Sequence, residues 1–185
     1  CPKGFQVLSI DLPGHGERQD WGEDLTPWAA VPDIRAALDW AGRRWNTVSL
    51  RANSIGAYFA MLAVDAPERA LLVSPILDME ELILTMMGWA GVTEEQLREQ
   101  GEIATSFGQT LSWNYLCWVR EHPVHNWTCP VCILYGGGDP MTPRRAVENY
   151  ARQHNAALTV MEDGEHWFHT AAQFAVLREW EEQST

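Results

Sequence analysis

Residues 49–58 read SLRANSIGAY and hold the pattern that decides the fold. A strand pattern ends here, Ser54 follows it, and an apolar helix pattern begins at once. This order is the context of a nucleophile elbow, a tight turn that exposes a reactive serine. Because the turn is tight, we expect larger side chains at positions 52 and 56 to collide with neighbouring backbone, which would explain Ala52 and Gly56.

The rest of the chain alternates between strand and helix patterns. Mostly apolar runs typical of strands covered on both faces occupy residues 5–10, 47–50, 70–73, 131–135 and 158–161. Helix patterns separate most of these runs, at residues 31–45, 55–66, 143–153 and 171–182. Such alternation predicts an α/β fold, with a mostly parallel sheet and flanking helices.

One long stretch, residues 75–127, interrupts the alternation. It is rich in methionine and aromatic residues, is broken by glycines, and contains no convincing strand pattern. We therefore expect two to four helices here, inserted as a cap or lid into a core formed by residues 1–74 and 128–185.

Composition narrows the possible partners. The 25 acidic residues exceed the 13 basic ones, so the net charge of −12 would repel phosphate backbones, and we expect no nucleic-acid partner. No apolar run approaches the ~20 residues that a membrane-spanning helix needs. No signal peptide is visible, and we expect a cytoplasmic protein acting on a small-molecule, ester-like substrate.

The four cysteines do not form a disulfide framework. Cys129 and Cys132 have the C-x-x-C spacing of redox and zinc sites, and Cys1 and Cys117 stand alone. The redox motif belongs where a strand passes into a helix, whereas this one leads straight into a strand pattern. No second C-x-x-C completes a zinc site. We expect ordinary reduced cysteines.

A serine hydroxyl becomes a strong nucleophile only when a base removes its proton and a third group orients that base. Residues 135–140, YGGGDP, place Asp139 just past a strand pattern, and residues 161–168, MEDGEHWF, place His166 just past the next one. Since the carboxyl ends of parallel strands meet at one edge of a sheet, we expect both side chains to reach Ser54.

Alternatives exist for each of these residues. Ser54 could be a helix N-cap, worth about 1 kcal/mol. Asp78 also follows a strand pattern and is the rival acid, although the glycines before Asp139 favour the latter. His169, one helical turn after His166, is the rival base.

The joint order of Ser54, Asp139 and His166 resembles the α/β-hydrolase superfamily. Residues 11–16, DLPGHG, resemble a segment that follows the fourth strand of many members, and the likeness extends over residues 5–180. It implies a catalytic triad on an α/β-hydrolase core, with the insertion in the place of the cap. His15 within DLPGHG is interpreted as a structural loop residue.

By this resemblance Ser54 is the nucleophile, His166 the general base and acid, and Asp139 the orienting carboxylate. The Ile55 N–H, at the start of a helix, can point at an oxyanion. The implied function is a serine hydrolase that cleaves a small or medium apolar carboxylic ester through an acyl-enzyme, with no metal or organic cofactor. The alternatives are a peptide, amide or thioester hydrolase of the same fold, and a catalytically silent binding protein.

In the superfamily, three strands and a helix precede the segment that resembles residues 11–16. We therefore expect this chain to correspond to the C-terminal two thirds of such a hydrolase, without the loop that supplies a second oxyanion donor. Losing one such donor typically costs about 10²–10³ in rate, so slow hydrolysis is expected.

Overall fold

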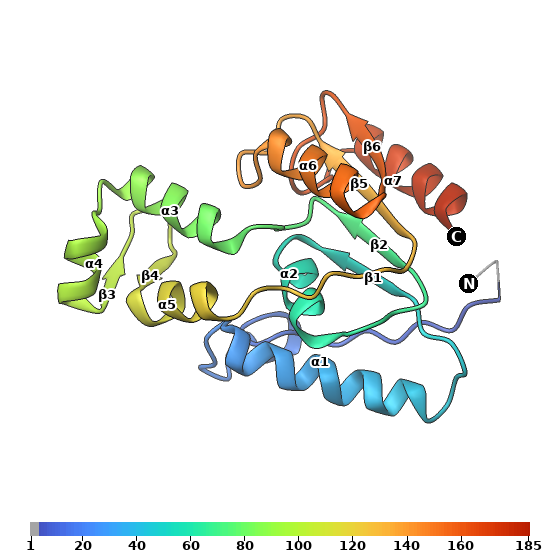
Figure 1. Ribbon diagram of the computed structural model, residues 1–185, viewed down its shortest axis with the longest axis horizontal. Helices are drawn as coiled ribbons and strands as arrows, with labels where there is room; N and C mark the ends of the chain where they lie inside the picture. The colour runs from blue at the N-terminus through green and yellow to red at the C-terminus, as the bar shows by residue number, and fades with distance from the viewer. Residues whose placement is uncertain (1–3) are drawn as a thin grey trace.

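The structure, a computed structural model, describes residues 4–185, and Cys1 lies outside the described residues. Its main sheet has four parallel strands in the order β1–β2–β5–β6 (Figure 1). They are β1 (Leu50–Asn53), β2 (Ala70–Val73), β5 (Val131–Gly136) and β6 (Ala157–Met161). The predicted α/β class with a mostly parallel sheet is confirmed, and the runs expected at residues 70–73, 131–135 and 158–161 are strands.

Helices cover both faces of this sheet. They are α1 (Pro27–Gly42), α2 (Ser54–Ala63), α6 (Arg144–His154) and α7 (Ala171–Ser184), with a 3₁₀ turn η1 (Gly16–Arg18) before α1. Because strand side chains alternate between faces, Leu72 of β2 belongs to the core shared with α1, α2 and α6. Its neighbour Leu71 belongs to a second cluster with Trp180 of α7.

Between β2 and β5 the chain forms a separate lobe beyond the carboxyl ends of the strands (Figure 1). Its elements are α3 (Met79–Ala90), α4 (Glu94–Gln100), β3 (Glu102–Ala104), β4 (Thr110–Ser112) and α5 (Trp113–Glu121). The three helices agree with the two to four expected. The expectation of no strand is wrong, because β3 and β4 pair as an antiparallel hairpin. Each is three residues long, too short for a period of two to be recognised in the sequence.

Two strand predictions near the N-terminus also need correction. Residues 5–10 are apolar but form no strand, and Val7 is 81% exposed. In the described part of the chain this segment pairs with no strand, and apolar composition alone does not satisfy backbone hydrogen-bonding groups. The run predicted at residues 47–50 lies too early, since β1 continues to Asn53. Its polar residues Arg51 and Asn53 face solvent, so the apolar pattern missed them.

After α5 the chain returns to the core along the end of α2. The buried Trp127 indole donates to the Val64 carbonyl oxygen at 2.6 Å, and the His125 N–H donates to the Met61 carbonyl at 3.0 Å. These bonds fix the return segment far from the carboxyl edge of the sheet.

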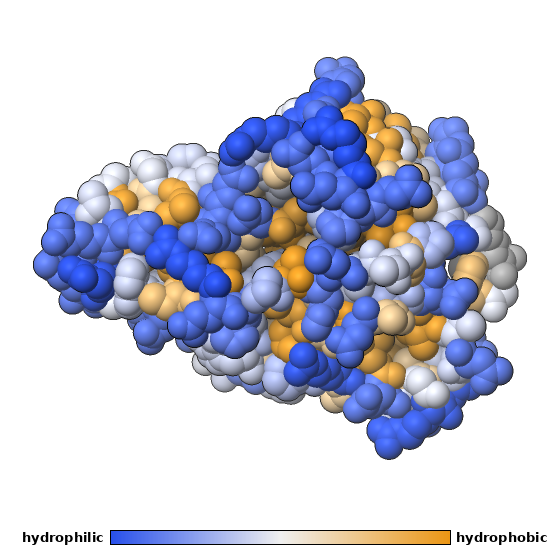
Figure 2. All heavy atoms as spheres, viewed as in Figure 1, coloured by the Kyte–Doolittle hydropathy of each residue, from blue (hydrophilic) through white to orange (hydrophobic). Residues whose placement is uncertain are grey.

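Hydrophilic residues cover much of the face drawn in Figure 2, with apolar patches between them. This surface agrees with the net charge of −12. Within residues 4–185, none of the helices combines the length and apolar character needed to cross a bilayer.

Candidate active site

Ser54 occupies a sharp strand-to-helix turn. It directly follows β1 and is the first residue of α2, with a φ of +49°. A positive φ is uncommon for a residue with a side chain and is found at strained functional positions. Asn53, and not Ser54, is the N-cap of α2. The N-cap interpretation of Ser54 is therefore wrong, and the turn has the geometry expected of an elbow.

The reason proposed for Gly56 is wrong. A Cβ on Gly56 would meet no atom within 4 Å outside its own helix. The turn is made by the φ of Ser54 itself, which the sequence does not reveal.

Three side chains that lie far apart in the sequence form a hydrogen-bonded series. Ser54 Oγ lies 2.7 Å from His166 Nε2, and His166 Nδ1 lies 2.7 Å from Asp139 Oδ2. The side chains of His166 and Asp139 are 2% and 0% exposed. The imidazole thus lies between hydroxyl and carboxylate, the arrangement in which a base can accept a proton from a serine.

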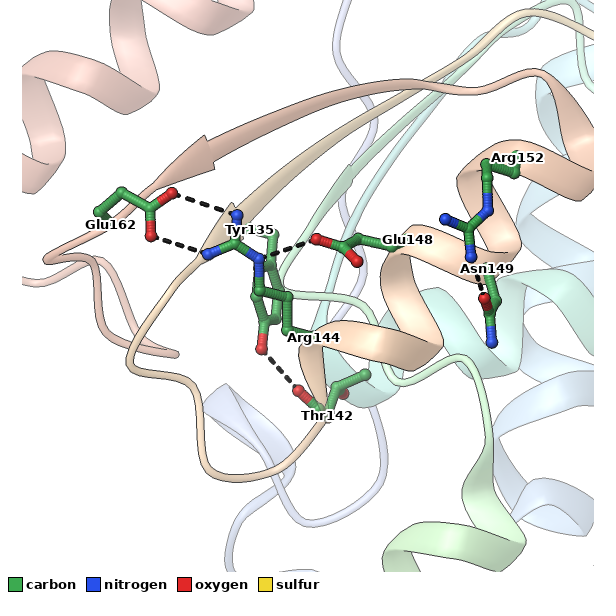
Figure 3. Close-up of polar contacts among 7 residues, drawn as sticks. All are labelled: Tyr135, Thr142, Arg144, Glu148, Asn149, Arg152 and Glu162. Atoms are coloured by element: carbon green, nitrogen blue, oxygen red, sulfur yellow. Dashed lines mark hydrogen bonds and ion pairs between the residues drawn. The ribbon is translucent and has the colours of Figure 1, made fainter.

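The Asp139 carboxylate is also held from its other oxygen. Asp139 Oδ1 accepts hydrogen bonds from the backbone N–H groups of Met141 at 2.8 Å and Thr142 at 3.3 Å. The Tyr135 hydroxyl donates to the Thr142 carbonyl oxygen at 2.7 Å (Figure 3). Burial, with a smaller contribution from Asp139, raises the pKa of Tyr135 to about 12, so the phenol remains a donor at neutral pH.

The sequence does not indicate the roles of Tyr135 and Thr142, because their partners are defined only by the folded loop.

The rival acid, Asp78, lies at the start of α3 and not beside His166. Asp78 is the N-cap of α3 and its exposed carboxylate accepts from the Glu81 N–H at 2.9 Å. The rival base His169 is exposed and pairs with Glu165.

The loops that carry Asp139 and His166 are packed closely through glycines. The N–H of Gly137 donates to the Met161 carbonyl at 2.8 Å, and that of Gly138 to the Gly164 carbonyl at 2.9 Å. A Cβ on Gly137 would lie 2.5 Å from the Glu162 carbonyl oxygen, so a side chain there would push the loops apart. Glycine is thus required by close approach of backbone.

Gly137→Ala is therefore expected to destabilise the protein by about 1–3 kcal/mol and to disturb the Asp139–His166 contact, because the loops must separate. The matched control is Gly88→Ala in α3, where a Cβ would meet nothing within 4 Å and the expected change is a gain of up to about 1 kcal/mol. Urea unfolding measures both variants. A Gly137→Ala protein as stable as the unsubstituted chain would contradict the close-packing argument.

Residues 11–16 form a turn held by their own polar groups. The Asp11 carboxylate accepts from the Glu17 N–H at 3.0 Å, and a Cβ on Gly16 would lie 2.3 Å from that carboxyl carbon. His15 is exposed, and its Nδ1 lies 3.0 Å from the Pro13 carbonyl oxygen. This geometry agrees with the structural interpretation of His15.

The other features that could form a site are a metal-binding cluster, the cysteines and a surface hollow. Within residues 4–185, no group of three or more His, Cys, Asp or Glu side chains could hold a metal ion, and Cys117, Cys129 and Cys132 are free thiols. A hollow of about 360 Å³ lies at the amino end of β1, lined by Leu50, Val64 and neighbouring residues. Ser54 is at the opposite end of that strand, so this hollow is not part of the surroundings of Ser54 and His166.

Comparisons with known proteins agree with this architecture. A sequence model of the alpha/beta hydrolase family matches residues 1–179. No curated protein sequence matches the chain significantly.

Solved structures show the same fold at low identity. A putative hydrolase from Agrobacterium vitis is 20% identical, with a TM-score of 0.72 over 94% of this chain and 74% of that one. Est1E from Butyrivibrio proteoclasticus, bound to ferulic acid, is 22% identical, with a TM-score of 0.73 over 94% and 73%. Mouse alpha/beta hydrolase domain-containing protein 10 is 16% identical, with a TM-score of 0.72 over 94% and 74%. These likenesses confirm the predicted fold.

Proposed function

The chain belongs to the alpha/beta hydrolase family, and on this basis we propose that it is a serine hydrolase that cleaves a small or medium apolar carboxylic ester. The observation that carries the proposal is the hydrogen-bonded series from Ser54 through His166 to Asp139. A thermophilic esterase from Thermogutta terrifontis shares the fold, as does Est1E, which binds ferulic acid, and this supports ester cleavage as the reaction class.

In the proposed acylation step, Ser54 Oγ attacks the ester carbonyl carbon while its proton passes to His166 Nε2. The carbonyl electron pair moves onto oxygen, where the Ile55 N–H in the first turn of α2 is a donor without an intrahelical acceptor. The bond to the alcohol then breaks, and the alcohol leaves with the proton from His166. Asp139 stabilises the imidazolium and fixes its orientation.

Deacylation repeats the same steps with water. His166 takes a proton from a water molecule while the oxygen of that water attacks the acyl carbon. Collapse of the second tetrahedral intermediate releases the carboxylic acid and returns the proton to Ser54 Oγ.

We assign residues 75–127 as the cap of this hydrolase. The lobe lies beyond the carboxyl ends of the strands (Figure 1). Ser54, Asp139 and His166 follow the carboxyl ends of β1, β5 and β6, and therefore belong to the same edge of the sheet. The lobe's apolar side chains, including Met87, Leu111 and Leu116, are buried among themselves and against the core.

Reaction with a fluorophosphonate tests the function. We expect one covalent phosphonyl adduct, because the activated Ser54 Oγ displaces fluoride from phosphorus, and peptide mass spectrometry should place the adduct on Ser54. The adduct should not form on Ser54→Ala. If the folded chain resists the reagent while binding small apolar esters without turnover, the catalytically silent alternative is correct.

A further inference from the structure

Thr142 makes hydrogen bonds to three different parts of the active-site edge. Its buried hydroxyl donates to the Pro75 carbonyl oxygen at 3.0 Å. Its backbone N–H donates to Asp139 Oδ1, and its carbonyl accepts the Tyr135 hydroxyl. The loop that carries the acid is thereby fixed to β5, and also to the segment where the chain leaves β2 for the lobe.

That segment also contacts the elbow. Ile76, next to Pro75, donates its N–H to the Ser54 carbonyl oxygen at 3.2 Å. The hydrogen bonds therefore form a closed ring. From the Ser54 backbone the ring passes through Ile76 and Pro75 to Thr142. It continues to Asp139 and His166, and returns to Ser54 Oγ.

A second connection joins the two loops on the solvent side. Arg144, at the start of α6, pairs with Glu162 at 2.8 Å and with Glu148 at 2.9 Å (Figure 3). These side chains are 41–68% exposed, so each pair is expected to contribute little stability on its own. The buried bonds of Thr142 are the better candidates for holding the acid.

We propose that Thr142 is a positioning residue of the hydrolase: its hydroxyl holds the acid loop against Pro75, so that the Asp139 carboxylate keeps its distance to His166 while His166 keeps its distance to Ser54. The inference rests on the proposed function. It connects Pro75 and Ile76, the first residues of the predicted cap, to both ends of the triad: Ile76 bonds to Ser54 directly, and Pro75 reaches Asp139 through Thr142.

The test compares Thr142→Val with Thr142→Ser. Valine keeps the shape but leaves the Pro75 carbonyl without its donor, whereas serine keeps the hydroxyl. We expect Thr142→Val to lower kcat about tenfold with KM little changed, since small misplacements of reacting groups are costly. Thr142→Ser should retain most of the kcat.

A spectroscopic readout separates positioning from stability. The proton between His166 Nδ1 and Asp139 should give a far-downfield proton NMR signal, which we expect to broaden in Thr142→Val and to remain sharp in Thr142→Ser. The matched control is Trp127→Phe, which removes the indole donor from the Val64 carbonyl and similarly leaves a buried oxygen without its donor. It should lose stability without changing the signal or kcat.

The proposal is wrong if Thr142→Val keeps both kcat and the downfield signal, or if Thr142→Ser and Trp127→Phe lose them equally. Should Thr142→Val fail to fold, Tyr135→Phe removes the donor to the Thr142 carbonyl and is expected to broaden the same signal. The signal does not require turnover. A chain that resists the fluorophosphonate but shows the Thr142 effect would refute the proposed function and leave the positioning role intact.

Discussion

Replacing Ser54 by alanine is expected to lower kcat for an activated ester by about 10⁵- to 10⁶-fold relative to the unsubstituted chain. Alanine removes the oxygen that would form the acyl-enzyme, and His166 then has no hydroxyl to activate. The measurement is the release of p-nitrophenol from p-nitrophenyl butyrate. Because nucleophile and base act as a unit, the double variant Ser54→Ala/His166→Ala should be no slower than Ser54→Ala alone.

Ser74→Ala is the matched control. Ser74 also follows a strand of the sheet, has a positive φ of +42° and is buried, but it takes no part in the hydrogen-bonded series of Ser54 and His166. Its kcat should stay close to that of the unsubstituted chain. A Ser74→Ala variant as inactive as Ser54→Ala, or a Ser54→Ala variant that keeps its activity, would show that the nucleophile is misassigned.

Asp139→Asn is expected to lower kcat about 10⁴-fold while the protein stays folded. An asparagine amide fits the same space, but it lacks the charge that stabilises the imidazolium and can hold the His166 ring in the wrong tautomer. The reaction with fluorophosphonate should slow as well, because it needs the same activated hydroxyl. Kinetics and thermal unfolding of the same preparation separate lost chemistry from lost structure.

The corresponding control is Asp78→Asn. Asparagine caps a helix about as well as aspartate, so α3 should keep its N-cap bond to the Glu81 N–H, and kcat should be little changed. If Asp78→Asn is the inactive variant and Asp139→Asn the active one, the acid of the triad is Asp78.

Much of the sheet and the candidate site follows from local patterns. The runs at β2, β5 and β6 are apolar because both faces of these strands are covered. Asp139 and His166 could be placed beside Ser54 because residues that follow parallel strands gather at one edge of the sheet. That rule identifies the edge of the sheet but not which carboxylate pairs with His166. Asp78, which also follows a strand, therefore satisfied the rule as well as Asp139 did.

At other positions the local patterns gave wrong predictions. Residues 5–10 have the composition of a strand, but a strand exists only where a neighbour pairs with its backbone, and none does in the described chain. β1 carries Arg51 and Asn53 on a solvent-facing side, which hid its true extent. The tight fit assigned to Gly56 belongs instead to Gly136 and Gly137, where the two loops meet.

The sequence by itself determined the alternation of strand and helix, the position of Ser54 between a strand and a helix, and the strand ends that carry Asp139 and His166. These depend on side-chain periodicity and on residues next to one another in the chain. Only the tertiary structure decided that Asp78 caps α3 while Asp139 reaches His166, and that Thr142 bonds to Pro75, 67 positions away. Contacts at such separations depend on the packing of whole strands and loops, for which a single sequence carries no local signal.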